Sequence, residues 1–148
     1  MPILEAGWVD TKSNRWSPQL LQIHGPTADV TVGWIIENEE DDVPDVEPAK
    51  ALIDTGASES CIDENLAIKL QLPVVDVNSM AGVGGAQDHN VYAAEVNITA
   101  LGFKQFGRFT GVHLVAGGQT HQVLLGRTFL QDIIMVYDGR RGHVTISV

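Results

Sequence analysis

The sequence is poor in cysteine and in basic residues, and each shortage excludes a class of protein. Cys61 is the single cysteine among 148 residues, so we expect no internal disulfide and a reducing compartment. Nine Lys and Arg stand against 19 Asp and Glu, which gives a formal net charge of −10. Binding to phosphate groups requires clustered basic side chains. We therefore expect no nucleic-acid partner.

Long apolar runs are also missing. No stretch approaches the ~18 consecutive apolar residues of a membrane-spanning helix. Residues 1–7 lack the basic region followed by an apolar segment that marks a signal peptide. We therefore expect a cytoplasmic protein with no membrane partner. None of the five histidines stands at metal-binding spacing from another, so we expect no metal ion and no cofactor.

One apolar run ends abruptly in a carboxylate, in the segment Ala-Leu-Ile-Asp-Thr-Gly-Ala-Ser at 51–58. A strand that ends in Asp and then turns on Gly presents one carboxylate at an accessible point of a rigid support. Asp54 is therefore the candidate catalytic residue. Taken alone, an Asp before Thr-Gly can equally be a turn residue that caps its own backbone.

Two further segments follow downstream. Met-Ala-Gly-Val-Gly-Gly-Ala at 80–86 lies between strand-like residues, and its glycines predict the tip of a hairpin. It has no third glycine at the spacing of a dinucleotide-binding loop, no Lys and no following helix pattern, so a phosphate-binding loop is excluded. Val-Leu-Leu-Gly-Arg-Thr-Phe-Leu at 123–130 joins an apolar stretch to Gly126 and Arg127.

In this order, the three segments resemble the Asp-Thr-Gly signature, the glycine flap and the Leu-Leu-Gly-Arg segment of retropepsin-like aspartic proteases. The resemblance covers roughly residues 50–146. It implies a mostly β, single-lobe acid-protease fold, a closed β-barrel with one or two short helices, active as a two-fold homodimer. It also implies an aspartic endopeptidase that acts on a peptide or protein substrate.

The resemblance assigns roles residue by residue. Asp54 is catalytic, and the active-site loop continues through Thr55, Gly56 and Ala57. The flap consists of Gly82, Val83, Gly84 and Gly85. A strand under the loop that passes into a short helix supplies structural support through Leu124, Leu125, Gly126 and Arg127.

Finer roles follow from the same resemblance. The Thr55 hydroxyl would reach across the dimer axis, the Gly56 carbonyl would face the substrate, and the Val83 N–H would lie over it. Arg127 would anchor the loop through a carboxylate. The viral enzymes carry Asp at the position of Ser58, so we expect Glu59 or Asp63 to be the partner here.

The chemistry requires a second carboxylate. In this family, two carboxylates face each other across one water and share a proton, because both cannot ionise at contact distance. The chain has no internal repeat, so the two lobes of a pepsin-like enzyme cannot both lie in it. We therefore expect a homodimer that brings Asp54 against Asp54 of its mate.

Length and patterning predict a single globular domain at 19–148 with an N-terminal extension at 1–18. Residues 37–48, rich in Asp and Glu and broken by two prolines, are expected to form a solvated loop. A helix is predicted at 63–72, with Asp63 at its N-cap. Strands are predicted at 19–24, 28–36, 49–53, 74–77, 91–101, 106–115, 133–137 and 143–148.

Other classes of function stay open. The chain can be a catalytically silent peptide-binding or dimerisation module on the same fold, or one domain of a larger regulatory assembly. The intact Asp-Thr-Gly and glycine segments favour the enzyme. Cys61 is interpreted as a small core residue rather than a nucleophile, since no activating base is recognisable near it.

Overall fold

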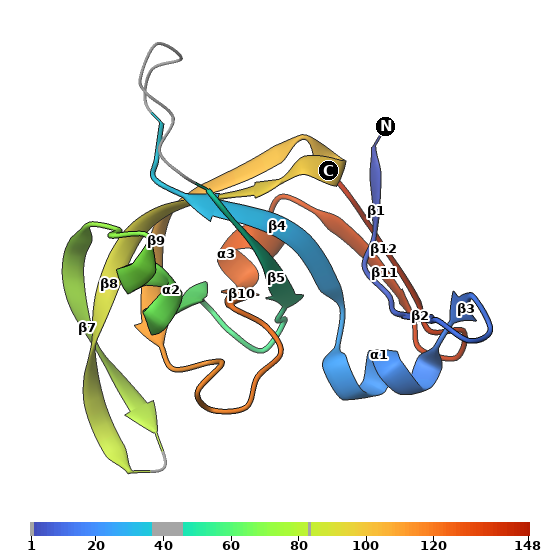
Figure 1. Cartoon of the computed structure of the whole chain (residues 1–148), viewed down its shortest axis with the longest axis horizontal. Helices are drawn as coiled ribbons and strands as arrows, with labels where there is room; N and C mark the ends of the chain where they lie inside the picture. The colour runs from blue at the N-terminus through green and yellow to red at the C-terminus, as the bar shows by residue number, and fades with distance from the viewer. Residues whose placement is uncertain (1, 37–45, 83) are drawn as a thin grey trace.

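A computed structural model describes residues 2–36, 46–82 and 84–148 of the chain (Figure 1). Strands predominate over helices, which confirms the mostly β fold. Most of the acidic segment predicted to be a solvated loop, residues 37–45, lies outside the described residues, as does Val83.

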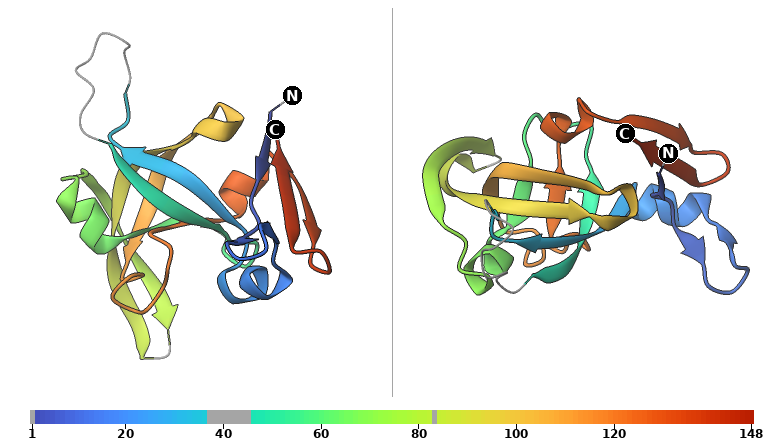
Figure 2. Two further views of the ribbon diagram at one scale, coloured as in Figure 1. Left: turned by 45° about the vertical axis from the view of Figure 1, so that its right-hand side comes forward. Right: turned by 90° about the horizontal axis from the view of Figure 1, so that it is seen from above.

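Seven strands form the larger sheet, in the order β4-β5-β10-β6-β9-β8-β7. They are β4 (Thr27–Gly33), β5 (Glu47–Ile53), β6 (Cys61–Asp63), β7 (Val74–Gly82), β8 (Gly85–Ile98), β9 (Phe103–Val112) and β10 (Val123–Leu125). Strand β4 also pairs with β8, where Thr31 opposes Asn97 and Gly33 opposes Glu95. The sheet therefore curls back on itself (Figure 2), while its closure into a barrel stays a prediction.

A second sheet joins the two ends of the chain. Its strands are β1 (Ile3–Glu5), β11 (Ile134–Asp138) and β12 (His143–Ser147), in the order β1-β12-β11. A short hairpin of β2 (Val9–Asp10) and β3 (Arg15–Trp16) stands apart from both sheets. Leu4 and Ala6 belong to the main hydrophobic core, so residues predicted to form an extension contribute to it. The domain boundary at 18 stays a prediction.

The helices are short. They are α1 (Pro18–His24), α2 (Glu64–Lys69), α3 (Arg127–Leu130) and the 3-10 turn η1 (Thr99–Leu101). The prediction of a strand at 19–24 is wrong, because these residues lie in α1. Ser17 Oγ accepts a hydrogen bond from the Leu20 N–H at 3.1 Å, and Pro18 occupies the first turn, where its missing N–H is not needed.

Helix α2 is shorter than predicted. It ends at Lys69, and Gln71 follows in the left-handed region with φ 54°. Asp63 occupies the N-cap position, but its side chain does not cap the helix. Its carboxylate is buried and accepts hydrogen bonds from the backbone N–H groups of Leu114 and Val115 at 3.0 and 3.2 Å. The Asp63 carboxylate thus binds a backbone segment about 50 residues away instead of capping the first turn of α2.

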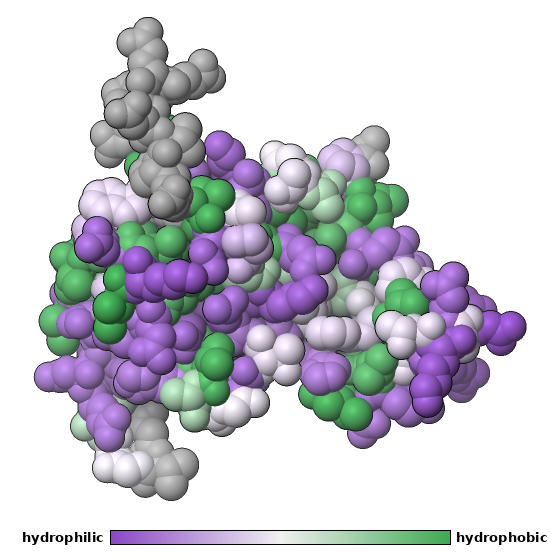
Figure 3. Space-filling model, in the orientation of Figure 1, coloured by the Kyte–Doolittle hydropathy of each residue, from purple (hydrophilic) through white to green (hydrophobic). Residues whose placement is uncertain are grey.

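The core follows the alternation of the strands. In β5, Ala49, Ala51 and Ile53 are buried while the residues between them are more exposed. Because Ile53 points inward, the alternation turns the next residue, Asp54, away from the core. On the face in Figure 3, hydrophobic residues gather in separate patches among hydrophilic ones.

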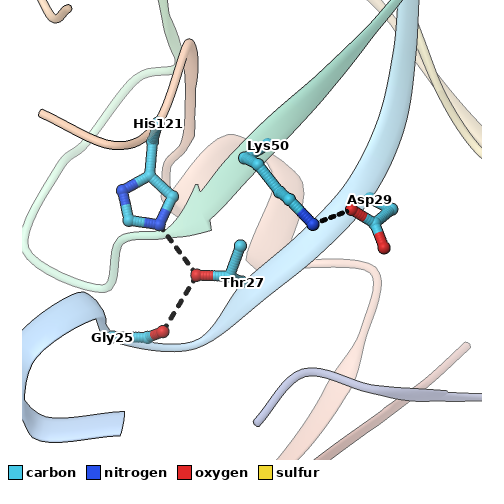
Figure 4. Close-up of polar contacts among 5 residues, drawn as sticks. All are labelled: Gly25, Thr27, Asp29, Lys50 and His121. Atoms are coloured by element: carbon cyan, nitrogen blue, oxygen red, sulfur yellow. Dashed lines mark hydrogen bonds and ion pairs between the residues drawn. The ribbon is translucent and has the colours of Figure 1, made fainter. Parts of the chain in front are cut away.

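A buried histidine connects the start of β4 to the segment before β10 (Figure 4). His121 is 2% exposed, and its Nε2 lies 2.7 Å from Thr27 Oγ1. The Thr27 hydroxyl donates its own hydrogen to the Gly25 carbonyl at 2.9 Å, so its oxygen must accept from Nε2–H. Nε2 of His121 therefore carries a hydrogen. Its Nδ1 has no hydrogen-bond partner among the described residues.

The surroundings of His121 oppose its protonation. Burial lowers the pKa of His121 below its ordinary value of 6.5, and the charges of His24 and Lys50 lower it further. Lys50 is itself paired with the exposed Asp29, and Trp8 packs on His24. Below about pH 6.5 the unfolded chain therefore binds a proton that the folded chain does not bind. This contribution to stability is complete above about pH 6.5 and is lost as the pH falls toward the folded-state pKa.

We expect the free energy of unfolding to fall less steeply between about pH 7 and about pH 5 in a His121→Gln variant than in the unaltered chain. Gln removes the titrating ring and retains an N–H that can reach Thr27. Urea unfolding across the pH range measures the difference. The neighbouring Gln122 supplies the control, since Gln122→Ala changes no titratable group and should retain the original slope. Equal slopes for all three chains would contradict the assignment of His121.

Candidate active site

Strand β5 delivers Asp54 to the surface beside β10. The two strands run parallel, with Leu124 opposite Leu52 and Leu125 opposite Ile53. The register continues beyond β5, because the Asp54 N–H donates to the Leu125 carbonyl at 2.9 Å. Leu125 is fully buried, as is the Gly126 that follows it. The predicted strand under the loop, followed by a short helix, is confirmed.

The loop after Asp54 folds back on its carboxylate. The Gly56 N–H donates to Asp54 Oδ1 at 2.9 Å, and the Ala57 N–H donates to the Asp54 carbonyl at 3.3 Å. Asp54 is half-buried, whereas Thr55 and Gly56 are exposed. Within the described residues, no group bonds Asp54 Oδ2. One carboxylate oxygen is thus fixed, and the other is available to a ligand.

The start of helix α3 holds this loop from below. The Arg127 N–H donates to the Ala57 carbonyl at 2.8 Å, and the Gly126 N–H donates to Ser60 Oγ at 3.1 Å. Gly126 has no room for a side chain, since a Cβ there would lie 2.5 Å from the Glu59 carbonyl oxygen. These contacts place the residues of the predicted support directly against the predicted loop.

The expected carboxylate partner of Arg127 is wrong. Neither Glu59 nor Asp63 pairs with it. Arg127 instead donates from Nη1 to the backbone carbonyl of Thr55 at 2.8 Å. The Asp63 carboxylate is occupied by the backbone near Leu114, as described above. The Arg127 side chain therefore holds the loop by binding the loop's backbone, at the Thr55 carbonyl. This contact requires no acidic side chain at position 58.

Ser60, which the sequence analysis did not assign to the support, lies at the centre of this framework. Ser60 is 1% exposed, accepts from the Gly126 N–H and lies 3.5 Å from Thr128 Oγ1. Its carbonyl accepts from the Thr110 N–H at 3.2 Å. No local pattern marks such a serine, because its partners are more than 40 residues away in the sequence.

Cys61 is buried, in agreement with its interpretation as a core residue. Burial raises the pKa of the Cys61 thiol to about 11, and the negative charges of Asp54 and Glu59 add to that increase. The thiol is therefore protonated at neutral pH and is a poor nucleophile.

A groove of about 460 Å³ lies between the loop and strand β7. Gly56 to Glu59 and Cys61 form one wall, and Asn78 to Met80 form the other, with Thr110 between them. A second hollow of about 300 Å³ continues from it past Glu59, Asn78 and Thr110 toward Arg108. Asp54 lies beside this groove rather than in its lining. The wall from β7 was not predicted.

The predicted hairpin is confirmed. Strand β7 pairs with the first part of β8, from Gly85 to Tyr92, and Gly82 opposes Gly85 at the far end. Gly85 has φ +97°, which favours glycine, and a Cβ on Gly84 or Gly85 would meet nothing within 4 Å. Val83, the predicted tip residue, lies outside the described residues. The hairpin projects from the body of the molecule (Figure 1), and its role as a flap stays a prediction.

The described residues contain neither a candidate metal site nor a helix that could cross a membrane. In this part of the chain, no group of three or more His, Cys, Asp or Glu side chains is placed to hold a metal ion. None of its helices has the length and apolar character needed to cross a bilayer.

Comparison with known families identifies the region that carries this site. The family described as "gag-polyprotein putative aspartyl protease" matches residues 44–132, which include β5, the Asp54 loop, the hairpin and all of α3. No curated protein matches the chain. The chain is also similar to a solved structure of EIAV protease complexed with the inhibitor HBY-793, at 21% sequence identity and a TM-score of 0.44. That similarity covers 72% of this chain and 86% of the other.

We expect Gly126→Ala to lower the free energy of unfolding by about 1–3 kcal/mol, because its Cβ would overlap the Glu59 carbonyl and separate α3 from the loop. Gly84→Ala is the matched control, since its Cβ enters open space. Urea unfolding of the two variants measures the difference. Equal stability of both variants would mean that the loop yields without cost and that the close approach at Gly126 is not a constraint.

Proposed function

The chain belongs to the family of gag-polyprotein aspartyl proteases, and on this premise we propose that it is an aspartic endopeptidase with Asp54 as its catalytic residue. One observation carries the proposal. Asp54 stands at the end of a buried strand with Oδ1 fixed by the Gly56 N–H at 2.9 Å, while Oδ2 is available. A carboxylate held in this way is oriented before substrate binds, which lowers the cost of reaching a reactive geometry.

The proposed reaction uses two such carboxylates and one water. The ionised Asp54 takes a proton from the water, whose oxygen then forms a bond to the scissile carbonyl carbon. The protonated partner carboxyl donates its proton to the carbonyl oxygen. Proton transfer to the peptide nitrogen then allows the C–N bond to break, which leaves a carboxylic acid and an amine. The pair shares one proton, because two carboxylates at contact distance cannot both ionise.

A two-fold homodimer supplies the second carboxylate in this proposal, as Asp54 of the mate. The exposed side chain of Thr55 would reach across the dimer axis, and the exposed Gly56 carbonyl would face the substrate. The outer face of the small sheet supports a contact between copies. Ile3 of β1 and Ile134 of β11 both oppose Ser147 and are 57% and 67% exposed. Apolar surface of this kind is typical of contact sites.

The β7–β8 hairpin would act as the flap. Its β7 wall already bounds the groove beside Asp54, through Asn78, Ser79 and Met80. Gly82, Gly84 and Gly85 would give the tip its backbone freedom, with Val83 between them. Closure over a bound peptide would exclude water from the carboxylates, as lids do in many enzymes.

We expect Asp54→Asn to reduce peptide hydrolysis by at least about 100-fold, the usual minimum contribution of a general acid–base group. The fold should be retained, because the Asn carbonyl oxygen can still accept from the Gly56 N–H. Cleavage of a diverse peptide library, followed by mass spectrometry, measures the activity, and thermal unfolding checks the fold. The exposed Asp132, at the end of α3, supplies the control variant Asp132→Asn.

Unchanged cleavage by folded Asp54→Asn protein would overturn the catalytic assignment. Peptide binding without cleavage by the unaltered chain would favour the silent binding module.

A mixing experiment tests the shared site. When Asp54→Asn chains replace unaltered chains at constant total protein concentration and the mixture is allowed to exchange, we expect activity to fall with the square of the unaltered fraction, since only dimers with two aspartates hold the shared proton. Dilution should also lower the activity per chain. Activity that falls in simple proportion to the unaltered fraction, and resists dilution, would show that one chain carries a complete site.

A further inference from the structure

The groove beside Asp54 has an uneven charge. Its walls carry small and polar side chains, from Ser58, Cys61, Asn78, Ser79 and Thr110. Among its described lining residues, Glu59 alone is charged. Glu59 also lines the second hollow, so its carboxylate stands where the two spaces meet.

No cation in the described part of the chain neutralises Glu59. It forms no ion pair there. Arg108, at the far side of the second hollow, is paired with Asp76, and this contact lowers the pKa of the Asp76 carboxyl. Arg127 is directed to the carbonyl of Thr55. The negative charge of Glu59 is therefore available to a ligand.

Groups near Glu59 add further hydrogen-bond acceptors and negative charge to the groove. Asn78 Nδ2 donates to Thr110 Oγ1 at 3.4 Å, which leaves the Asn78 carbonyl oxygen as an acceptor. Burial raises the pKa of the Cys61 thiol, and the negative charges of Asp54, beside the groove, and of Glu59, in its wall, raise it further. A cationic side chain entering here would meet a carboxylate and an amide oxygen together. An acidic side chain would meet repulsion from both carboxylates.

We propose that Glu59 is a specificity-determining residue that selects peptides placing a Lys or Arg side chain in the groove beside Asp54. This inference rests on the proposed function, because the groove is taken as part of the substrate site. The cationic head binds the Glu59 carboxylate, and its N–H groups also donate to Asn78. The aliphatic stem packs against Met80 and Ala57, which line the same groove. The bound peptide removes water from this contact, which strengthens it beyond an exposed ion pair.

The substrate class is tested with one defined peptide library in two assays. Cleavage by the unaltered full-length chain is read by mass spectrometry, and binding to the Asp54→Asn chain is read by affinity selection. We expect Lys and Arg to be enriched at one position relative to the scissile bond in both assays. Peptide pairs that differ only by Lys and norleucine at that position should differ about tenfold in kcat/KM, the effect of one charge-assisted hydrogen bond.

Two substitutions at Glu59 connect the preference to its carboxylate. Glu59→Gln should bring the ratio of Lys to norleucine peptides close to one, and Glu59→Lys should shift the preference to Asp and Glu. The control Asp132→Asn removes one negative charge that lines neither this groove nor the second hollow and should leave the ratio unchanged, which separates a local contact from long-range attraction.

The outcomes separate this inference from the proposed function. Cleavage without enrichment of Lys or Arg, or with a preference that Glu59→Gln leaves intact, overturns the role of Glu59 while the enzyme stands. Glu59-dependent binding of basic peptides without cleavage supports the role of Glu59 and overturns the enzyme. The absence of both binding and cleavage overturns both.

Discussion

The site depends on the parallel pairing of β10 with β5. A loop that leaves a buried strand must satisfy its backbone N–H and carbonyl groups, because such groups cost free energy when they are buried without partners. Here the Asp54 N–H binds the Leu125 carbonyl, and the Ala57 and Thr55 carbonyls accept from Arg127. Strand β10 and the first residue of α3 therefore fix the position and the orientation of the loop together. The orientation of the Asp54 carboxylate is thus a property of two segments that are more than 60 residues apart.

Features with local causes were predictable from the sequence. The end of a buried strand at Asp54, the hairpin at 80–86 and the strand before Gly126 each have a pattern that lies within a few residues. Helix α1 had a local signal too, the pair Ser17–Pro18, but the Leu and Ile content of 19–24 favoured a strand instead. The strand propensity of these residues is outweighed there by the Ser17 N-cap, which satisfies a backbone N–H of the first helical turn.

Features with distant causes were not predictable. The acceptor of Arg127 is a backbone carbonyl, and any residue at position 55 supplies one, so no side-chain pattern can mark it. Asp63 carried a signal for an N-cap, yet the N–H groups of Leu114 and Val115 compete for its carboxylate and bind it. The β7 wall of the groove likewise arises only when the hairpin folds against the loop. In each case the partner is fixed by tertiary packing.

The long strand β8 has a mechanical consequence. Residues 91–98 are held by β9, and 95–97 also by β4, whereas Gly85 to Asn90 pair with β7 alone. The hairpin is therefore fixed to the rest of the sheet at Val91 and Tyr92 and is free at its other end. Opposite this fixed end, β7 has a register irregularity between Val74 and Asp76. Such an irregularity is a natural place for a strand to bend. A rotation there displaces each residue in proportion to its distance from the bend, so Asn78 moves least and Met80, two residues before Gly82, moves much further. The groove can therefore widen at Met80 while it keeps most of its width at Asn78.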